Sequence, residues 1–460
     1  MTARVDLNRA LDPFSARVLV ERDPAGSAVV ARLDLHGLPR VDGLLTGRPV
    51  QDVPALVERL CGVCPVAHHL AGVRALESLY GIGALPPAAQ AMRRLLHHGS
   101  VLTMHALRFS TVAGDAALAL QRLGKLAMVA AGSPGHFPTT AVVGGVAAPA
   151  DPDALGRCAL GLPEARTAAV RLARALLAEG SQPDRFAGPS VALTDDAGQP
   201  DLFGGRLRAV LGEDVIVGAA PAPQWADLIA EALPGDPAPR PYLVGLGPDA
   251  GRYRVGPAAQ IRVGAIATPL ARELQHRWRD SGNGGAASAR AVMAVHGVEA
   301  IAELLDDPSA FAGDVRTAGP VEAGAAAAGA VEARVGGQLA EDADSRACAP
   351  ESVATGVGWV DGARGLLVHR YDASSDGRMV RAQVLTPTAQ NEYWLSQLLV
   401  RAVRTTPDGP VELCTELEDA IREADPCLPC ASAPPGQMGL TIQTVPRSVP
   451  PRLDSPLGGP

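Results

Sequence analysis

Two pairs of cysteines near opposite ends of the chain are the residues best suited to chemistry. Cys61 and Cys64 form one C-x-x-C, Cys427 and Cys430 form another, and His68 follows the first pair. Each C-x-x-C can bring two sulfur atoms to one side of a turn, and four thiolates suit zinc or softer combinations such as nickel with iron. A redox-active pair is an alternative, but the strand–helix–strand context of thioredoxin-like proteins is absent. We therefore predict a metal site, with a four-cysteine zinc site as one form of it.

The distance between the pairs along the chain bears on the kind of site. More than 350 residues separate Cys64 from Cys427. A metal shared by both pairs must therefore be enclosed by the whole fold. This favours a cofactor in the middle of a large domain over a small zinc module.

Composition excludes several classes of protein. The chain has 460 residues, is 47% hydrophobic and carries a net charge of −8 without any basic block, so nucleic acid and anionic membrane are poor candidate partners. The sequence has no apolar run long enough for a membrane span and no secretory signal at its N-terminus, so we predict a cytoplasmic protein. Its 7 cysteines are odd in number and irregularly spaced, which argues against a disulfide framework.

The elements that must position the cysteines are mostly helical. Apolar residues recur at helical spacing, or helix-forming residues dominate, in five segments: 51–82, 86–132, 162–180, 391–404 and 410–423. Strand patterns with turn residues occupy 16–35 and 357–388. Residues 281–350 are rich in Ala and Gly and fit either a helix or a loose insertion. No linker or internal repeat is evident, so one domain over residues 1–460 is predicted.

The residues around the cysteines resemble the large subunit of nickel–iron hydrogenases. The N-terminal signature of that family matches residues 47–72, and its C-terminal signature matches residues 425–430, DPCLPC. Residues 363–369 resemble the family's Pro-Arg-Gly motif, and residues 386–391 resemble its Thr-x-Asn segment. These matches occur in family order over nearly the whole chain.

The resemblance implies a fold and a set of partners. The fold class is α+β, mainly α: a bundle of long helices with peripheral β segments, in which both cysteine pairs meet at the core. Residues 436–440 are most similar to the cytoplasmic branch that couples to NAD(P) or a deazaflavin. An iron–sulfur small subunit is expected as a partner, because this chain has no cysteines left for an electron relay. Hydrogenase maturation proteins and NAD(P)- or deazaflavin-reducing subunits complete the expected partners.

The resemblance also implies how the metals are held. Cys61 and Cys427 are the expected terminal nickel ligands, and Cys64 and Cys430 are expected to bridge nickel and iron. The iron of this family also carries CO and cyanide, which maturation proteins install. The implied activity is heterolytic cleavage of H2 between a Lewis-acidic metal and a basic thiolate.

Several further residues receive roles from the resemblance. Arg364 is expected to reach over the metals, and His68 to hydrogen-bond a bridging thiolate. Glu21 is the candidate proton acceptor, although the Gly-His that follows it in the family is missing here. Asp42 takes the position of a family glutamate that binds magnesium. Asp361 is the candidate for the family's glutamate before Pro-Arg-Gly. The other early histidines are predicted to be core or solvated residues: His69, His97, His98 and His105.

The sequence departs from the family after the last cysteine. Family members have Cys-x-x-His and are cleaved after that histidine, but Ala433 stands at this position and a tail follows it. Residues 431–460 are therefore predicted to be a processing tail whose removal is in question. An alternative function follows from this departure: a non-catalytic homologue that serves as a maturation scaffold or an H2 sensor.

Overall fold

The computed structural model describes residues 15–23, 28–35, 42–179, 185–236, 238–280, 285–317, 353–405 and 410–445. Contacts between residues divide the chain into two compact units. The main unit is Leu38–Asn391, and the terminal unit combines Met1–Gly37 with Glu392–Pro460. One domain over the whole chain therefore remains a prediction.

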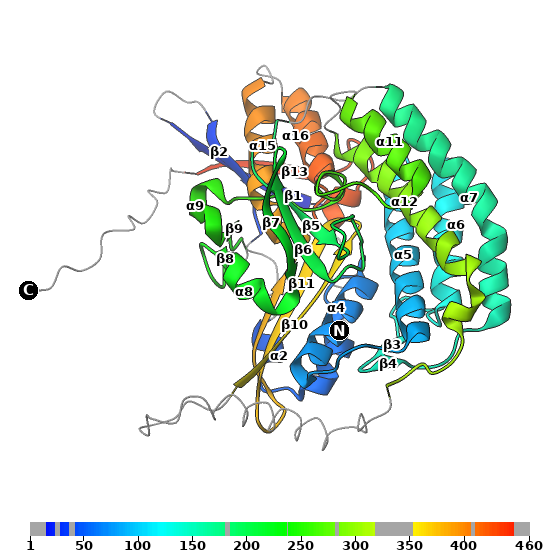
Figure 1. Cartoon of the computed structure of the whole chain (residues 1–460). Coiled ribbons are helices and arrows are strands. Elements are labelled where there is room, and N and C mark those ends of the chain that lie inside the picture. Colours follow the sequence, from blue (N-terminus) through cyan, green and yellow to red (C-terminus); the bar gives the residue numbers. More distant parts are fainter. Residues whose placement is uncertain are drawn as a thin grey trace, which may run out of the picture. The chain divides into compact units, whose positions relative to one another are not determined.

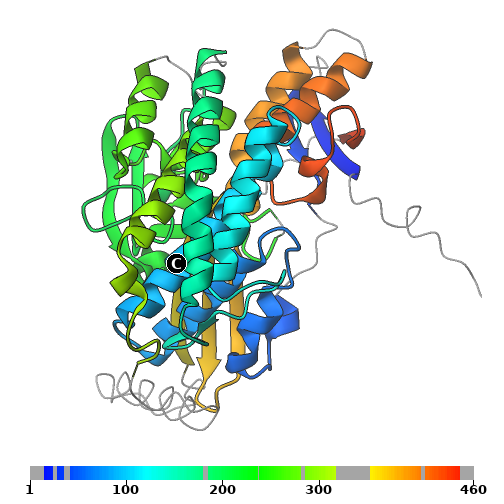
Figure 2. The same ribbon diagram turned by 90° about the vertical axis from the view of Figure 1, so that its right-hand side faces the viewer.

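Long helices dominate one part of the main unit. They are α5 (Pro87–Phe109), α6 (Gly114–Ala130), α7 (Pro152–Ala178), α11 (Pro269–Asp280) and α12 (Ala286–Asp306). Figures 1 and 2 show α5, α6, α7 and α12 side by side as a bundle. Their apolar faces meet inside it, so the predicted long-helix bundle is confirmed.

One predicted helix start was wrong. The sequence predicted a helix over residues 162–180. The helix α7 instead begins at Pro152, where the Asp151 carboxylate accepts a hydrogen bond from the Asp153 N–H, and it continues through Pro163. The residues before Pro163 are mostly exposed, so they gave no strong apolar pattern.

A three-stranded antiparallel sheet forms a second part of the main unit, packed against α4 (Pro65–Tyr80). Its strands are β10 (Val353–Gly362), β11 (Gly365–Ser374) and β12 (Met379–Leu385). A Cβ on Gly358 would lie 2.2 Å from the Ala75 backbone nitrogen, so only glycine permits this approach of strand to helix. The strands predicted in residues 357–388 are thus confirmed.

Shorter elements complete the main unit. The helical ones are α2 (Asp42–Leu45), η1 (Val50–Asp52), α3 (Val53–Val57), η2 (Ala222–Gln224), α8 (Trp225–Leu228), η3 (Val244–Leu246), α9 (Gly247–Ala250), α10 (Pro257–Gln260), η4 (Pro308–Phe311) and α14 (Pro387–Gln390). The strands are β3 (Ala141–Val142), β4 (Gly145–Val146), β5 (Ser190–Thr194), β6 (Arg206–Leu211), β7 (Asp214–Pro221), β8 (Ile229–Glu231) and β9 (Pro241–Leu243). The Ala- and Gly-rich insertion forms α12 in its first part, and residues 318–352 lie outside the described residues.

The terminal unit joins the two ends of the chain in one sheet. Its strands are β1 (Ser15–Arg22), β2 (Ala28–Leu33) and β13 (Gly439–Val445), in the order β13-β1-β2. The strand β13 runs parallel to β1, with Ser15 opposite Gly439 and Glu21 opposite Val445. The helices are α15 (Glu392–Thr405), α16 (Pro410–Ala424) and η5 (Pro429–Ser432). In the described part of either unit, no helix is long and apolar enough to cross a membrane.

Candidate metal centre

The first cysteine pair lies in the loop between α3 and α4. Cys64 is the residue before the first turn of α4 and is buried, with 9% of its surface exposed, whereas Cys61 is partly buried. The positive end of a helix dipole stabilises negative charge, so the position of Cys64 suits a thiolate ligand. Pro65 begins the helix, where its missing N–H costs no hydrogen bond.

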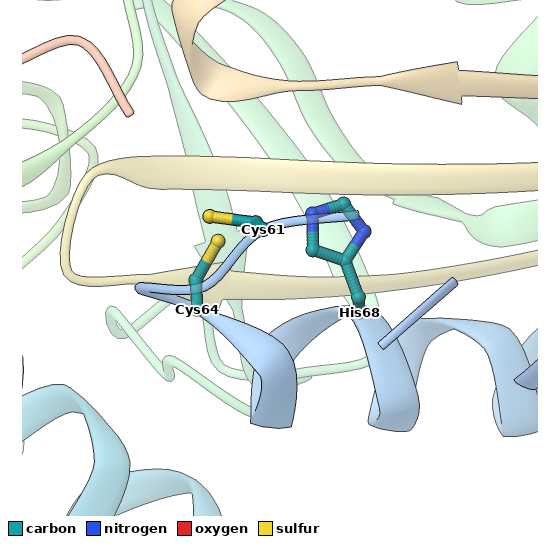
Figure 3. Close-up of side chains that lie close together, drawn as sticks. All are labelled: Cys61, Cys64 and His68. Carbon is teal, nitrogen blue, oxygen red and sulfur yellow. The ribbon is translucent and has the colours of Figure 1, made fainter. Parts of the chain in front are cut away.

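His68 joins this pair from the next turn of the same helix. The two sulfur atoms and a ring nitrogen of His68 all lie within 4.8 Å of one another. Figure 3 shows both sulfur atoms and the edge of the imidazole ring gathered at one end of the helix. Two soft sulfur donors and a nitrogen this close together fit a thiophilic metal such as nickel, iron or zinc. The structure therefore brings together three of the residues that the sequence singled out.

A hydrogen-bonded chain leads from His68 into the protein. Its Nδ1 lies 3.1 Å from Nε2 of His369, and Nδ1 of His369 lies 2.7 Å from the Tyr371 hydroxyl. Burial lowers the pKa of His68 to about 4, against a smaller opposing effect of Cys61. Burial also lowers the pKa of His369 well below its usual range, and the neighbouring His68 lowers it further. Both imidazoles are therefore neutral at neutral pH.

Arg364 lies in the turn between β10 and β11. The turn needs glycine at position 365, where φ is +122° and a Cβ would lie 2.6 Å from the Gly256 nitrogen. The side chain of Arg364 is buried, with 4% of the residue exposed. This burial does not fit a surface arginine that only forms a salt bridge with a neighbour. The hairpin packs on α4, the helix that begins at the first cysteine pair.

Asp361 anchors the same hairpin from three residues before Arg364. It is fully buried and accepts hydrogen bonds from the Leu193 backbone N–H at 2.9 Å and from Gln260 Nε2 at 2.6 Å. Burial raises the pKa of Asp361 to about 7, although both hydrogen bonds oppose the rise. The carboxyl group therefore titrates near neutral pH, and it joins β10 to β5 and α10.

Asn391 supports the turn through Val255. Its Oδ1 accepts a hydrogen bond from the Val255 N–H at 2.9 Å, and its Nδ2 donates to the Val255 carbonyl at 3.3 Å. Val255 in turn packs where a Cβ on Gly365 would be. The Thr-x-Asn segment of the sequence is thus a brace for the hairpin that carries Arg364.

A second pair of buried polar residues was missed by the sequence analysis. Nδ1 of His69 lies 3.1 Å from Oε2 of Glu58, and both side chains are buried. Glu58 ends α3 and His69 lies in α4, so their contact closes the loop that holds Cys61 and Cys64. The signal for this pair was available, because the two residues flank the C-x-x-C. The pattern His369-x-Tyr371 was a similar signal, since alternate residues of a strand share a face.

The second cysteine pair belongs to the terminal unit. The helix α16 ends at Ala424, and Asp425 adopts a left-handed conformation with φ +47°, which aspartate tolerates better than most residues. Cys427 is partly buried, and Cys430 is buried inside η5. Burial raises the pKa of the Cys430 thiol. The two cysteine pairs thus lie in different units, and their meeting at one centre stays a prediction.

The two remaining candidates stay untested as site residues. Glu21 is buried in β1 of the terminal unit, and its Oε1 lies 3.8 Å from Nη1 of Arg32. Asp42 begins α2 of the main unit, and its side chain lies outside the described residues. The four histidines predicted to be core or solvated residues are all buried: His69, His97, His98 and His105.

Comparison with known proteins agrees with this geometry. Residues 40–114, which hold the first cysteine pair and α5, match the family model "Nickel-dependent hydrogenase". The chain is 26% identical to the beta chain of the NAD-reducing hydrogenase HoxS of Cupriavidus necator, over 93% of both chains. It is 27% identical to one chain of the F420-non-reducing hydrogenase of Methanothermobacter thermautotrophicus, over 91% of this chain and 92% of that one.

Solved structures show the same fold. An NAD+-reducing [NiFe]-hydrogenase in its H2-reduced state superposes with a TM-score of 0.73 at 26% identity, covering 90% of this chain and 97% of that one. The Ni-Fe-Se hydrogenase of D. vulgaris Hildenborough has the same fold, with a TM-score of 0.61 at 18% identity. Fold and site thus define a mainly helical subunit in which two cysteines and a histidine lie close enough together to suit a metal. The chain resembles the large subunits of nickel-dependent hydrogenases over nearly its whole length, and this likeness supports an oxidoreductase subunit with a nickel and iron centre.

Proposed function

We propose that this chain is the large subunit of a cytoplasmic nickel–iron hydrogenase that cleaves or forms H2. The observation that carries the proposal is the convergence of Cys61, Cys64 and His68 beside a hairpin with the buried Arg364. Family membership supports nickel and iron as the metals. When bound, such a centre supplies a Lewis acid that polarises H2 for heterolytic cleavage.

Four thiolates hold the centre in this proposal. Cys61 and Cys427 would hold nickel as terminal ligands, and Cys64 and Cys430 would be ligands shared by nickel and iron. The proposal requires the terminal unit to bring its pair to the pair of the main unit. The iron would carry CO and cyanide, and Asp42 would be a ligand for magnesium. These details rest on the resemblance of the motifs that contain the residues.

The remaining residues have three proposed roles: to hydrogen-bond a thiolate, to place a positive charge near the metals and to accept a proton. His68 donates an N–H toward a thiolate sulfur and tunes its basicity, in the way that outer hydrogen bonds tune other metal ligands. Arg364 places a guanidinium over the site, where burial strengthens its electrostatic effect. Glu21 accepts the proton from the sulfur of a cysteine and passes it outward. Its burial beside Arg32 supports a role beyond that of a surface carboxylate.

Electrons must leave through a partner. The cysteines outside the two pairs are Cys158, Cys348 and Cys414, which are too few and too scattered in sequence for an iron–sulfur relay. We therefore propose that the direct partner is an iron–sulfur small subunit. An NAD(P)- or deazaflavin-reducing module is the proposed final acceptor, because relatives include a chain of the NAD-reducing hydrogenase HoxS. Maturation proteins are the expected source of the metals.

The test is isotope exchange between H2 and deuterated water, which needs no electron acceptor. We expect exchange by the complex purified from its own host, and none from the Cys61→Ser variant. Cys158→Ser is the matched control, because Cys158 is a buried free cysteine within α7 of the bundle. Equal exchange by the Cys61→Ser and Cys158→Ser variants would refute the proposal.

A second function is favoured by one observation. Ala433 stands where the family has the histidine that marks the cleavage site, and the residues beyond it form β13 of a sheet. A chain that keeps this tail fits a maturation scaffold or an H2 sensor. Intact mass distinguishes the two functions: a mature enzyme has lost the tail together with β13, and a scaffold retains it.

A further inference from the structure

Three buried groups of the main unit form a chain that ends at the first cysteine pair. The Tyr371 hydroxyl, the His369 ring and the His68 ring are joined by hydrogen bonds of 2.7 and 3.1 Å. All three residues are buried, and β11 carries two of them while α4 carries the third. A chain of this kind has two possible directions, depending on which atom of each pair carries the proton.

Tyr371 determines which atom of each hydrogen-bonded pair is the donor. Among the residues that the structure describes, Nδ1 of His369 is the hydrogen-bond partner of the Tyr371 hydroxyl, and no other partner is within reach. The hydroxyl also lies against α4, 3.2 Å from where a Cβ on Gly72 would be. If the hydroxyl accepted a proton from His369, its own proton would be buried without an acceptor, which is unfavourable. Tyr371 therefore donates to His369.

The proton positions of both imidazoles follow from this first bond. Because Nδ1 of His369 accepts, its proton is on Nε2, and this N–H donates to Nδ1 of His68. The single proton of the neutral His68 ring is then on Nε2. Burial agrees with neutral groups, because it lowers the pKa of His369 and raises that of Tyr371. Figure 3 shows one ring nitrogen of His68 on the side of the cysteine pair, and Nε2 is the nitrogen that His369 does not engage.

We propose that Tyr371 and His369 are positioning residues that fix His68 as its Nε2–H tautomer, with that N–H directed at the cysteine pair. The inference rests on the proposed function in one respect, that the two thiolates serve as metal ligands. Its consequence is a choice between two roles for His68. A bare Nε2 beside two thiolates is a good third ligand for zinc, whereas an N–H in the same place donates to sulfur. The chain of hydrogen bonds thus makes His68 a donor and disfavours a zinc site.

The test reads the tautomers directly. The full chain, labelled with 15N in its histidines, is studied by two-bond 1H–15N correlation, and the signals are assigned with His68→Gln and His369→Gln. We expect His68 and His369 both to be Nε2–H tautomers in the parent chain. The Tyr371→Phe variant lacks only the hydroxyl oxygen. Without this donor, we expect His369 and His68 no longer to be held as Nε2–H tautomers alone. An Nδ1–H signal for His68 in the parent, or unchanged tautomers in Tyr371→Phe, would overturn the proposal.

Matched variants separate positioning from general damage. Tyr253 is also buried and its hydroxyl donates one hydrogen bond, to Gln390 Oε1 at 3.0 Å, so Tyr253→Phe is expected to leave both tautomers unchanged. His369→Gln retains an N–H that can donate to His68 and is expected to preserve the His68 tautomer, whereas His369→Leu is not. Equal signals from these two His369 variants would also overturn the proposal.

The test distinguishes a failure of this inference from a failure of the proposed function. If protein from its own host holds no nickel, the hydrogenase proposal fails, while the tautomers still decide the direction of the chain. If nickel is present and the tautomers differ from those expected, only the positioning roles of Tyr371 and His369 are withdrawn.

Discussion

The two cysteine pairs share a sequence pattern but lie in very different surroundings. The first pair precedes a buried 16-residue helix, α4, and is bordered by the Glu58–His69 contact and by the chain from His68 to Tyr371. The second pair follows a residue with positive φ, and only its second member, Cys430, lies in a helix, the four-residue η5. Tertiary packing thus fixes the first pair within its own unit, whereas the second pair depends on the chain that follows it.

The segment after the second pair is held by one ion pair. Glu418 of α16 accepts hydrogen bonds from the N–H groups of Gly436 at 2.8 Å and Met438 at 3.1 Å. Arg422 bonds to Glu418 at 2.7 Å and to the Ala433 carbonyl at 3.3 Å. The strand β13 follows directly. The difference teaches that buried contacts of its own unit surround the first pair, whereas the segment next to the second pair is joined to α16 through Glu418 and Arg422.

The strongest way to break this comparison is to remove one thiolate from each pair. If both pairs serve one centre, Cys61→Ser and Cys427→Ser should both reduce bound nickel and H2 turnover to background. Nickel is measured by mass spectrometry on protein from the native host. Nickel that persists in Cys427→Ser at the parental level would show that the first pair is a separate site.

The next largest effect is expected from a substitution in the hairpin of β10 and β11. Arg364→Lys should retain the metals but lower H2 turnover by roughly 10²–10³-fold, because an ammonium does not reproduce a buried planar guanidinium. Arg370→Lys is the control, since Arg370 is on the same hairpin and, among the residues that the structure describes, forms a single ion pair, of 3.3 Å, with Asp372. Turnover and metal content are measured on the same samples. An equal loss in the two variants would remove Arg364 from the mechanism.

Acid should affect the main unit in a predictable direction. Burial lowers the pKa of His97 from 6.5 to about 4, and that of His68 similarly. Between these pH values the unfolded chain binds more protons than the folded one, so stability is lost as pH falls from about 6.5 to 4. The loss is at most about 3 kcal/mol per histidine. All the histidines in the described part of the chain lie in the main unit.

Urea unfolding at a series of pH values measures this effect. The unfolding midpoint of the parent should fall steeply below pH 6.5, and His97→Gln should have a shallower pH dependence. The exposed His276 provides the control variant His276→Gln. If the unfolding midpoints of His97→Gln and His276→Gln depended on pH equally, the buried neutral His97 would not be the cause of the loss of stability in acid.

The smallest effect concerns the segment after the second pair. Glu418→Gln weakens the contacts with Arg422 and with the N–H groups of Gly436 and Met438. The substitution should destabilise the segment after the second pair by about 1–3 kcal/mol. Hydrogen exchange of residues 436–445 is expected to become faster, with little change in α4. Asp419→Asn is the control, because Asp419 is exposed and lies 3.5 Å from the same arginine. Unchanged exchange in Glu418→Gln would show that this ion pair does not hold the segment.

The sequence predicted much of the fold because its long helices are strongly amphipathic. The segments 86–132 and 357–388 appear as the predicted helices and strands. The early start of α7 was missed, because its first turns are exposed and contain no apolar stripe. Local periodicity cannot report a helix turn that does not contribute to a core.

The sequence could predict those contacts of the candidate site that join residues of one short motif. Cys61, Cys64 and His68 are close in sequence, and the structure brings them together. The bond from His68 to His369 joins positions 301 residues apart, and no local pattern announces such a contact. The parallel pairing of β13 with β1 was missed for the same reason, since it joins the two ends of the chain.

The central claim is that one nickel and iron centre is held by this chain, and metal content tests it most directly. Nickel and iron are measured per chain in protein purified from its own host with its partner. We expect one nickel together with iron, lost in Cys61→Ser and retained in Cys158→Ser. Iron without nickel, or zinc in place of both, would contradict the account.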